Sequence, residues 1–325
     1  MPNPASNHHD VIVAAVIPCY RETARISAVI EGIGPEVGLI VIVDDACPDG
    51  TGAHVRAHCR DPRVEVIVQA RNTGVGGATA AGYLRALERG AGIVVKLDGD
   101  GQMDPAMIPK LIRPIQRGRA DYAKGNRFWD LDGLAQMPWH RILGNLLLSF
   151  MNKLSSGYWD VFDPTNGFTA IHAEVLRRLP LGKIARGFFF ESDMLFRLNT
   201  IRAVVIDVPM AAHYGGEISS IRLGKVAIEF PYRHLVNLTK RIFYAYFLRD
   251  FSVASLQLVL GFLMTGFGGV FGIWAWHESV ASGRPATTGT VFLAALPIIV
   301  GVQLLLSFLD FDSRSLPREP LQNRL

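Results

Sequence analysis

Short apolar runs alternate with amphipathic stretches over the first hundred residues. Four runs have the length and composition of buried strands: Val11–Ile17, Leu39–Val43, Val64–Val68 and Ile93–Leu97. The stretches between them carry apolar residues at helical spacing: Ala24–Ile33, Gly52–His58 and Gly76–Arg89. This βαβα order predicts an α/β domain with a mostly parallel sheet and helices on both faces. In such sheets, ligands bind beyond the carboxyl ends of the strands.

The pattern changes further along the chain. From Pro105 to about Ser220 it is less regular, with helices predicted at Pro138–Leu154 and Phe189–Leu198. Then Phe251–His277 and Pro285–Leu309 form uncharged runs of 27 and 25 residues. Because about 20 helical residues cross the hydrocarbon core of a bilayer, we expect two transmembrane helices. We place them at about residues 252–276 and 286–309 of a membrane region 251–310. The alternative, a pair of buried core helices, rarely needs such lengths without charge.

Basic residues flank these runs. Residues 222–249 carry six Lys or Arg against Glu229, interleaved with aromatic residues, which predicts basic amphipathic helices over 221–250 on an anionic membrane surface. The tail 311–325 adds Arg314, Arg318 and Arg324. By the positive-inside rule, both ends and the globular domain are expected in the cytoplasm. Residues 1–10 are polar and lack the regions of a secretory signal, so we interpret them as a disordered leader.

Composition adds little to this interpretation. The net charge of +4 over 325 residues is concentrated near the apolar runs, so it does not indicate nucleic acid as a partner. The mean hydropathy of +0.23 is high for a soluble enzyme and has the same local origin. Three cysteines (Cys19, Cys47 and Cys59) make neither a disulfide framework nor a CxxC metal pair.

The most informative chemistry follows the fourth strand. The run Ile93–Leu97 ends in Asp98-Gly99-Asp100, with Gln102 close behind. Two carboxylates one residue apart at the end of a buried strand can turn toward one hard cation such as Mg²⁺ or Mn²⁺. An ordinary Asp/Gly turn is the alternative, because short motifs are common by chance.

The ends of the first three strands carry similar chemistry. Strand one ends in Pro18-Cys19-Tyr20-Arg21-Glu22, strand two in Asp44-Asp45, and strand three is followed by Arg71-Asn72-Thr73-Gly74-Val75-Gly76. Carboxylates accept hydrogen bonds from a base or ribose, Arg forks onto phosphate, and glycine allows close backbone approach. Each loop alone is compatible with a turn, whereas together they indicate one binding rim.

These motifs resemble the nucleotide-sugar glycosyltransferases of family 2, which have the GT-A fold. The match lies in Ile-Pro-Cys-Tyr-Arg-Glu at 17–22, Val-Asp-Asp-Ala-Cys-Pro-Asp-Gly-Thr at 43–51 and Asp-Gly-Asp-Gly-Gln at 98–102. Lys124-Gly125-Asn126-Arg127, Arg141 and residues 163–168 are similar to the branch acting on polyprenyl phosphates. That branch includes dolichyl-phosphate mannose synthases and bacterial undecaprenyl-phosphate glycosyltransferases. The resemblance covers about residues 11–220.

The resemblance implies a role for each matching residue. The nucleotide sugar would be bound by Pro18, Tyr20, Glu22, Asp44, Asp45, Arg71, Asn72, Gly76 and Asp98. The metal, Mg²⁺ or Mn²⁺, would be held by Asp98, Asp100 and Gln102. The acceptor phosphate would meet Lys124, Arg127, Arg141 and His213. The catalytic residues would be Asp100, Arg127, Asp163 and Asp193.

The implied reaction is inverting transfer of a hexose from a UDP- or GDP-sugar to a polyprenyl monophosphate, in the bacterial inner membrane. Two assignments keep alternatives. Glu191 and Asp193 either orient substrate or complement a helix start, and His213 stands where relatives place an Arg, so an ordinary loop histidine fits as well. Gly268 and Gly272 have GxxxG spacing, which fits either a homo-oligomer or packing between the two spans.

Two other functions share parts of this pattern. A glycan-extending synthase has the same nucleotide-sugar loops but carries a Gln-x-x-Arg-Trp motif, and Gln136-Met137-Pro138-Trp139 lacks the Arg. A catalytically inactive membrane scaffold would keep the fold, although the intact Asp98, Asp100 and Arg127 do not favour it.

Overall fold

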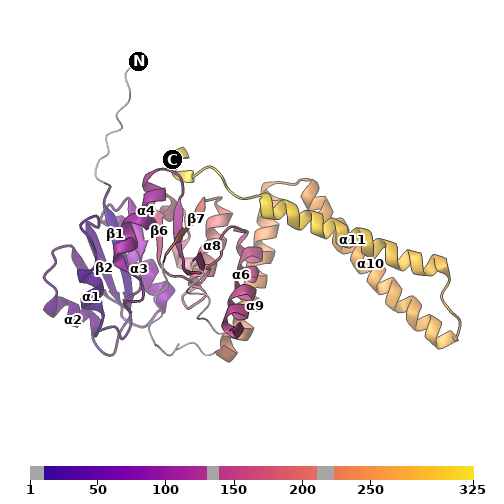
Figure 1. Ribbon diagram of the computed structural model, residues 1–325, viewed down its shortest axis with the longest axis horizontal. Helices are drawn as coiled ribbons and strands as arrows, with labels where there is room; N and C mark the ends of the chain where they lie inside the picture. The colour runs from indigo at the N-terminus through magenta and orange to yellow at the C-terminus, as the bar shows by residue number, and fades with distance from the viewer. Residues whose placement is uncertain (1–10, 130–138, 211–222) are drawn as a thin grey trace, which may run out of the picture. The chain divides into compact units, whose positions relative to one another are not determined.

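The computed structural model describes residues 11–129, 139–210 and 223–325, without the side chains of 139–141 and 223–227. The chain forms two compact units, one of residues up to 238 together with 317–325, and one of residues 239–316 (Figure 1). We call the first the catalytic unit and the second the apolar unit, and describe each by itself.

The catalytic unit alternates strands and helices along most of its length. Its strands are β1 Val13–Cys19, β2 Leu39–Asp44, β3 Val64–Val68, β4 Ile93–Lys96, β5 Tyr122–Asn126, β6 Thr169–His172 and β7 Val205–Pro209. Its α-helices are α1 Ile26–Glu31, α2 Thr51–His58, α3 Val75–Glu88, α4 Ile108–Gln116, α6 Trp139–Ser156, α7 Ala173–Arg177, α8 Phe190–Thr200 and most of α9 Leu223–Phe243. Short 3₁₀ turns are η1 Pro105–Met107, η2 Arg127–Trp129, η3 Leu181–Lys183 and η5 Leu321–Arg324.

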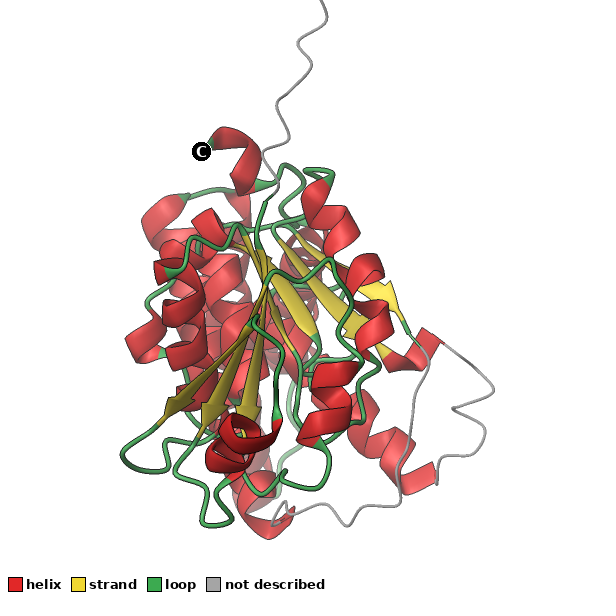
Figure 2. Cartoon of the chain, turned by 90° about the vertical axis from the view of Figure 1, so that its left-hand side faces the viewer, coloured by secondary structure: helices red, strands yellow, loops and turns green. Residues whose placement is uncertain are grey.

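The strands form one seven-stranded sheet in the order β3-β2-β1-β4-β6-β5-β7. Strands β3, β2, β1 and β4 are parallel, β6 is antiparallel to both β4 and β5, and β7 is parallel to β5. The predicted mostly parallel sheet with helices on both faces is confirmed, as Figure 2 shows. The single reversed strand has a consequence for the site. The carboxyl ends of β1, β2, β3, β4, β5 and β7 lie at one edge of the sheet. The start of β6 lies at the same edge, because β6 runs in the opposite direction.

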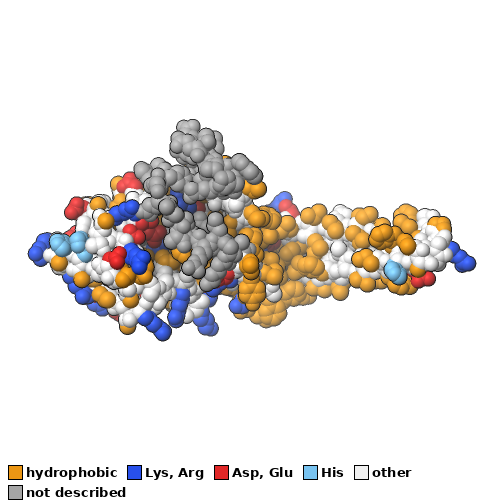
Figure 3. All heavy atoms as spheres, turned by 90° about the horizontal axis from the view of Figure 1, so that it is seen from below, with side chains coloured by type: hydrophobic (Ala, Val, Ile, Leu, Met, Phe, Trp, Pro, Cys, Tyr) orange, Lys and Arg blue, Asp and Glu red, His pale blue; other side chains and the backbone are white. Residues whose placement is uncertain are grey.

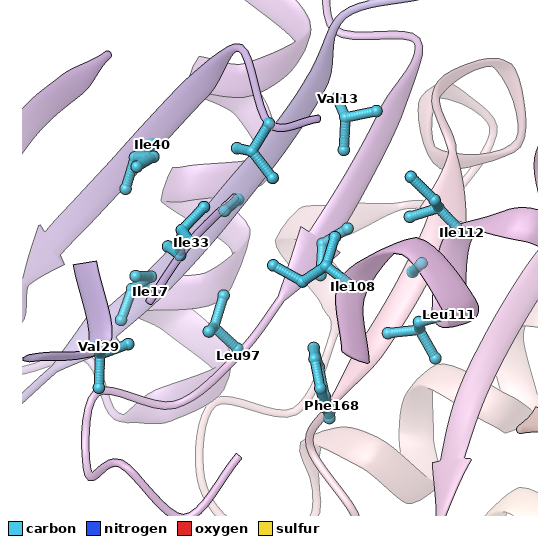
Figure 4. Packing of buried hydrophobic residues seen from close by; sticks show 14 of the residues in the cluster. Val13, Ile17, Val29, Ile33, Ile40, Leu97, Ile108, Leu111, Ile112 and Phe168 are labelled. Carbon is cyan, nitrogen blue, oxygen red and sulfur yellow. The ribbon is translucent and has the colours of Figure 1, made fainter. Parts of the chain in front are cut away.

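Alternation along the strands gives the sheet two apolar faces. On one face Val13 and Ile17 of β1 pack with α1 and with a stripe on α4 at helical spacing (Figure 4): Ile108, Leu111, Ile112 and Ile115. On the other face lies α3, where a Cβ on Gly82 would meet the side chain of Val16, so glycine permits close packing there. Each fully buried aliphatic side chain contributes about 1.5–3 kcal/mol, so these faces fix the strand ends that carry the site.

The last residues of the chain pack on the catalytic unit. We call residues 317–325 the C-terminal clasp. The backbone N–H groups of Leu321 and Gln322 donate to the buried carboxylate of Asp121, at 2.8 and 2.9 Å. The Val204 N–H donates to the same carboxylate at 2.7 Å. Asn323 adds a side-chain hydrogen bond to the carbonyl of Gly118 at 2.9 Å. The clasp therefore returns the chain to the catalytic unit after the apolar helices.

The apolar unit contains two long helices, α10 Val253–Ser282 and α11 Thr288–Arg314, preceded by a π-helical turn η4 at Tyr244–Arg249. Both helices are long and apolar enough to cross a membrane, and only 22% and 11% of their most apolar windows are buried. Apolar side chains cover the visible surface of the pair (Figure 3). Such exposure is unlike that of the core helices of a soluble protein, which makes the pair candidate membrane spans.

Glycines set the distance between α10 and α11. A Cβ on Gly261 would lie 3.1 Å from the carbonyl oxygen of Gly301, and one on Gly268 would lie 2.6 Å from that of Ala294. The helices therefore approach closely only because glycine stands at these positions. Of the two uses expected for the Gly268–Gly272 spacing, packing between the two helices is observed.

A buried ion pair lies at the start of the apolar unit. The Arg241 guanidinium donates to both oxygens of Asp312, at 2.6 and 2.9 Å, and the Tyr246 hydroxyl donates to Asp312 at 2.7 Å. This pairing satisfies a buried carboxylate near the end of α11 and links it to the residues before α10.

Candidate active site

The loops predicted to carry chemistry gather at one edge of the sheet. The carboxyl ends of β1, β2, β3 and β4 lie there because these strands are parallel. The end of β5 joins them, because β5 runs antiparallel to β6, which itself opposes β4. Residues that precede β6 reach the same edge. Two groups of side chains result, one after β1 to β4 and one around β5 to β7.

Asp44 at the end of β2 holds its own loop. Its two carboxylate oxygens accept backbone N–H groups from Cys47 at 2.7 Å and from Gly52 at 2.6 Å. A Cβ on Gly52 would lie 2.8 Å from the Asp44 Oδ2, so the glycine permits this approach. The side chain is buried, and its hydrogen bonds give it a local structural role besides the nucleoside contact expected of it.

Asp45 ties the second loop to the third. Its carboxylate accepts the Thr73 N–H and hydroxyl at 2.7 and 2.8 Å and the Gly74 N–H at 2.8 Å. Gly74 has a φ of 77°, a conformation that glycine adopts without strain. The side chains of Arg71 and Asn72 just before it are exposed at the rim. Asp45 therefore shapes the loop that presents them.

Gly76 packs against protein rather than lying open to a ligand. Its N–H donates to the carbonyl of Arg186 at 2.8 Å, and a Cβ at this position would collide with the carbonyl of Ala185. The expected nucleotide contact at Gly76 is therefore replaced by close packing of the start of α3 on the segment before α8.

The first loop is attached to the second. After Pro18, near the end of β1, Tyr20 is exposed and the Arg21 guanidinium lies 5.5 Å from its ring centre. The Arg21 N–H donates to the Cys47 sulfur at 3.0 Å, and the Glu22 N–H donates to the Thr51 hydroxyl at 3.3 Å. This arrangement leaves the Tyr20 ring at the surface of the rim.

Three carboxylates crowd together where β1 and β4 end. Burial raises the pKa of Asp100, and the nearby Asp98 raises it further. Burial also raises the pKa of Glu22, with added contributions from Asp100 and Asp98. Gln102 donates its N–H to Asp100 at 3.0 Å in a turn through Gly101, whose φ is 74°. Carboxylates that repel one another in a partly buried place are stabilised by a bound cation.

The donor set fits a hard divalent ion that also binds substrate. Among the residues that the structure describes, no group of three or more His, Cys, Asp or Glu side chains could enclose a metal ion. Mg²⁺ in phosphate chemistry is commonly held by one or two carboxylates plus substrate phosphates. Asp98 and Asp100 match that pattern, with other coordination positions left to a ligand.

A buried lysine forms ion pairs at this acidic group. Lys96 is 1% exposed, and its ammonium lies 2.8 Å from Asp98 and 3.3 Å from Glu191. Burial lowers the pKa of Lys96, but the carboxylates of Asp98 and Glu191 more than offset this effect and leave it raised. Sequence reasoning missed Lys96, although a charged residue inside the apolar run Ile93–Leu97 was a visible signal.

The second group of side chains centres on Arg127 and Asp163. The Arg127 Nε and Nη2 donate to the two oxygens of Asp163 at 2.8 and 3.0 Å, and its backbone N–H donates at 3.2 Å. Asp163 is fully buried, whereas Arg127 is partly exposed. A fork-to-carboxylate pair fixes the plane of the guanidinium and therefore the direction of its other N–H groups. The structure thus brings together two residues that the resemblance implies.

Lys124 departs from its predicted role. It is fully buried, and its ammonium donates to the backbone carbonyl of Asn166. Burial lowers the pKa of Lys124 to about 8. A side chain enclosed in this way does not reach a phosphate at the surface, so direct contact with the acceptor is not supported.

Asp193 also departs from its predicted role. Its carboxylate accepts the Ala185 N–H and the Arg197 Nε, both at 2.9 Å, and the Asn237 amide at 3.3 Å. These contacts join α8 to the preceding segment and to α9, which is a structural role. Glu191, two residues earlier, is the acid that lies beside Lys96 at the site.

Two predicted residues lie outside the described side chains, and one residue near the site was not predicted. Arg141 lies in α6 with its side chain outside the described residues, and His213 lies in a segment that is also outside them. Asp207 on β7 was not predicted: its Oδ2 accepts the Asn126 amide at 2.8 Å and the Phe162 N–H at 3.0 Å. Its signal in the sequence was faint, a single acid within a short apolar strand.

The fold and the two groups of side chains are those of a sugar-transferring enzyme. Residues 14–179 match the model of glycosyl transferase family 2, and the chain belongs to that family. The predicted GT-A fold and family are confirmed.

Named relatives narrow the comparison. The chain is 32% identical to undecaprenyl-phosphate mannosyltransferase of Micrococcus luteus, over 61% of this chain and 82% of that protein. It is 31% identical to a UDP-N-acetylglucosamine–dolichyl-phosphate N-acetylglucosaminyltransferase of Methanococcus voltae, over 68% of this chain and 93% of that protein.

A solved structure supports the fold alone. Glucosyl-3-phosphoglycerate synthase from Mycobacterium tuberculosis, in complex with Mn²⁺, UDP and glucosyl-3-phosphoglycerate, superposes with a TM-score of 0.53 at 19% identity. The superposition covers 71% of this chain and 80% of that one.

Proposed function

We propose that this chain transfers a sugar from a nucleoside diphosphate sugar to the phosphate of a polyprenyl phosphate in a membrane, with inversion at the sugar. One observation carries the proposal: the acidic group of Asp98 and Asp100 and the Arg127–Asp163 pair lie at the same edge of the sheet. The first suits a metal-bound diphosphate and the second suits a phosphate acceptor. The named relatives act on undecaprenyl and dolichyl phosphates, which supports this acceptor class.

The donor half would be formed by the loops after β1 to β4. Exposed Tyr20, Arg71 and Asn72 would contact the nucleoside and its ribose, while Asp44 and Asp45 hold the loops that present them. Aromatic faces stack on a base, and Arg forks onto phosphate or a base edge. Both UDP and GDP sugars fit such a frame.

Asp98, Asp100 and Gln102 would hold Mg²⁺ or Mn²⁺ against the diphosphate. A divalent ion bound there would stabilise the negative charge of the departing nucleoside diphosphate. Burial, with added repulsion between the neighbouring carboxylates, raises the pKa values of Glu22 and Asp100, and a bound cation would relieve that repulsion. The Lys96 ammonium, 2.8 Å from Asp98, holds that carboxylate in place.

The acceptor half would be formed around Arg127. Its guanidinium, oriented by Asp163, would hold the acceptor phosphate, with Arg141 and His213 as further contacts. A phosphate monoester has a second pKa near about 6, so it is largely dianionic at neutral pH and needs little help from a general base. The position of Glu191 is consistent with this, because its carboxylate pairs with Lys96 and is not available as a general base.

The transfer step would be a direct displacement. An oxygen of the acceptor phosphate attacks the anomeric carbon and forms a new carbon–oxygen bond. The bond from that carbon to the donor phosphate breaks, and the nucleoside diphosphate leaves with the electron pair. The residues of the rim act by positioning the two phosphates and by balancing their charge.

The membrane setting rests on several features of the chain. Helices α10 and α11 would cross the bilayer, and exposed apolar side chains on α6 and α9 would face its surface: Leu143, Leu146, Leu147, Phe150, Ile228, Tyr232 and Leu235. The chain leaves the catalytic unit before α10 and rejoins it at the clasp, so the number of crossings would be even. The basic flank would place the catalytic unit in the cytoplasm, at the inner membrane of a bacterium.

The test is a transfer assay in detergent. Purified protein with Mg²⁺ or Mn²⁺ and undecaprenyl phosphate is offered radiolabelled UDP- and GDP-sugars, and label entering the organic phase is counted. We expect one donor to give a lipid product that is lost on chelation. Asp100→Asn should abolish the product, whereas Glu31→Gln, which removes an exposed acid at the end of α1, should not.

Three outcomes are distinguishable. A lipid product with one donor supports the proposal and identifies the sugar. Metal-dependent release of nucleoside diphosphate without a lipid product rejects the acceptor. Metal-dependent binding of a donor without any turnover indicates an inactive scaffold.

A further inference from the structure

Asp207 lies next to the proposed acceptor group without being part of it. On adjacent parallel strands, Asp207 of β7 pairs in register with Lys124 of β5. Its Oδ2 accepts two hydrogen bonds, one from the Asn126 side-chain amide at 2.8 Å and one from the Phe162 backbone N–H at 3.0 Å. The two donors come from segments about 36 residues apart in sequence, so one carboxylate joins them.

Each donor is the immediate neighbour of a residue in the ion pair. Asn126 precedes Arg127, and Phe162 precedes Asp163. The Asn126 Oδ1 also accepts the N–H of Phe128 at 2.9 Å, so the amide reaches across Arg127 to the residue after it. The turn that carries Arg127 and the loop that carries Asp163 are therefore both held by Asp207.

We propose that Asp207 is a positioning residue for the acceptor phosphate, acting through Asn126 and Phe162 on the Arg127–Asp163 pair. The proposal rests on the proposed function, because it assigns Arg127 to the acceptor. Asp207 itself touches no substrate: it sets the distance and plane at which the guanidinium meets a phosphate. A bidentate contact with phosphate is sensitive to such placement.

The surroundings of Asp207 make its charge depend on pH. Facing it are Lys124 and Asn126 of β5 and Asp163 of the loop before β6. Burial raises the pKa of Asp207 to about 6, against the attraction of Lys124 and the two hydrogen bonds. Its Oδ1 is buried and has no hydrogen-bond partner among the described residues. That oxygen can take a proton without displacing a partner.

The sign of the pH effect follows from this raised pKa. Above about pH 6 the carboxylate is charged and accepts strongly from Asn126 and Phe162. As the pH falls through that value, the group is neutralised and both hydrogen bonds weaken. Acceptor binding should therefore lose strength in the same range in which the acceptor phosphate itself takes up a proton.

The experiment separates these two protonations. Wild type, Asp207→Asn and Asn126→Ala are compared with Asp160→Asn, which removes an exposed acid two residues before Phe162. The assay measures KM for undecaprenyl phosphate, KM for the sugar nucleotide and kcat, from about pH 5 to 8. We expect both test variants to raise the acceptor KM about tenfold at neutral pH, with the donor KM unchanged.

The pH profile gives a readout that a general loss of stability would not change. With metal ion and donor both saturating, so that protonation of Asp100 does not contribute, the logarithm of kcat/KM for the acceptor should fall on the acid side with two protons in wild type, in Asp160→Asn and in Asn126→Ala. In Asp207→Asn the same logarithm should fall with one proton, because only the acceptor phosphate then takes up a proton. A one-proton fall in wild type overturns the proposal even if Asp207→Asn does not fold.

Equal acceptor KM in wild type and Asp207→Asn also overturns it, as does a donor KM that rises in parallel. Failure of the proposed function looks different, because wild type then transfers no sugar to the lipid phosphate at any pH.

Discussion

Release of the C-terminal clasp can be tested at a single side chain. The fully buried carboxylate of Asp121 accepts three backbone N–H groups, from Val204, Leu321 and Gln322, at 2.7 to 2.9 Å. Asp121→Ala removes both acceptor oxygens and therefore all three hydrogen bonds at once. Without them, the clasp keeps side-chain hydrogen bonds from Gln322 to Ile115 and Ala120 and from Asn323 to Gly118.

The magnitude follows from the number of lost hydrogen bonds. A hydrogen bond to a charged group contributes about 1.5–3 kcal/mol, and neighbouring bonds are not additive. Loss of three such bonds should therefore lower the free energy of unfolding of the catalytic unit by about 3–5 kcal/mol. This is a large part of the roughly 5–15 kcal/mol by which a domain is stable. Asp121→Asn keeps one acceptor oxygen and should cost about half as much.

The assay is amide hydrogen exchange of the detergent-solubilised protein, with thermal unfolding measured alongside. In Asp121→Ala the Leu321 and Gln322 amides should exchange much faster than in wild type, and the transition should shift to lower temperature. Asn323→Ala, which removes one hydrogen bond at the edge of the clasp, serves as the matched control and should cost about 1 kcal/mol. Unchanged protection of both amides in Asp121→Ala would refute the reasoning.

Three other predictions concern the rim and the apolar helices. Asp100→Asn should weaken Mn²⁺ binding, measured by electron paramagnetic resonance with Glu31→Gln as control. In wild type that binding should weaken as the pH falls, because the raised pKa of Asp100 lets protons compete with the ion. Arg127→Lys keeps the charge but loses the fork, so kcat/KM for the acceptor should fall about tenfold to a hundredfold in steady-state assays with the donor KM unchanged; equal values would remove Arg127 from the acceptor site. Gly268→Leu should force α10 and α11 apart and lower the melting temperature in detergent, whereas Gly269→Leu, where a Cβ meets nothing within 4 Å, should have little effect.

Much of the first half of the fold could be predicted from the sequence. The four predicted strands, which begin at Val11, Leu39, Val64 and Ile93, agree with β1 to β4 within about two residues. They could be predicted because buried parallel strands are nearly continuous apolar runs. Strand β6 and its reversed direction could not be predicted. On the neighbouring strands β5 and β7, Lys124 and Asp207 interrupt the apolar pattern, and the burial of Lys124 depends on partners distant in sequence.

The sequence predicted the position of the site better than the roles of its individual residues. Strand ends in a parallel sheet meet at one edge, so Asp44, Asp45, Asp98 and Asp100 were expected near one another, whereas Arg127 was assigned only through the resemblance. Residue types alone do not show which polar side chains form hydrogen bonds with the backbone instead of with a ligand. Asp44 is engaged by backbone N–H groups, and Asp193 by a backbone N–H and two side chains, contacts that exist only once the loops have closed.

The reversed strand β6 divides the rim by chain segment as well as by chemistry. Everything assigned to the donor lies between β1 and the turn after β4, in one continuous stretch of about 90 residues. Every described side chain assigned to the acceptor follows β5 or precedes β6, and β6 separates β4 from β5 in the sheet. Changes that suit a new sugar nucleotide can therefore arise in the first stretch without disturbing the Arg127–Asp163 pair, provided that the contacts of Gly76 and Lys96 with residues 185–191 are kept. In evolutionary terms, the two specificities of such a chain are separable, and each can drift or be exchanged by recombination near residue 105 while the other is retained.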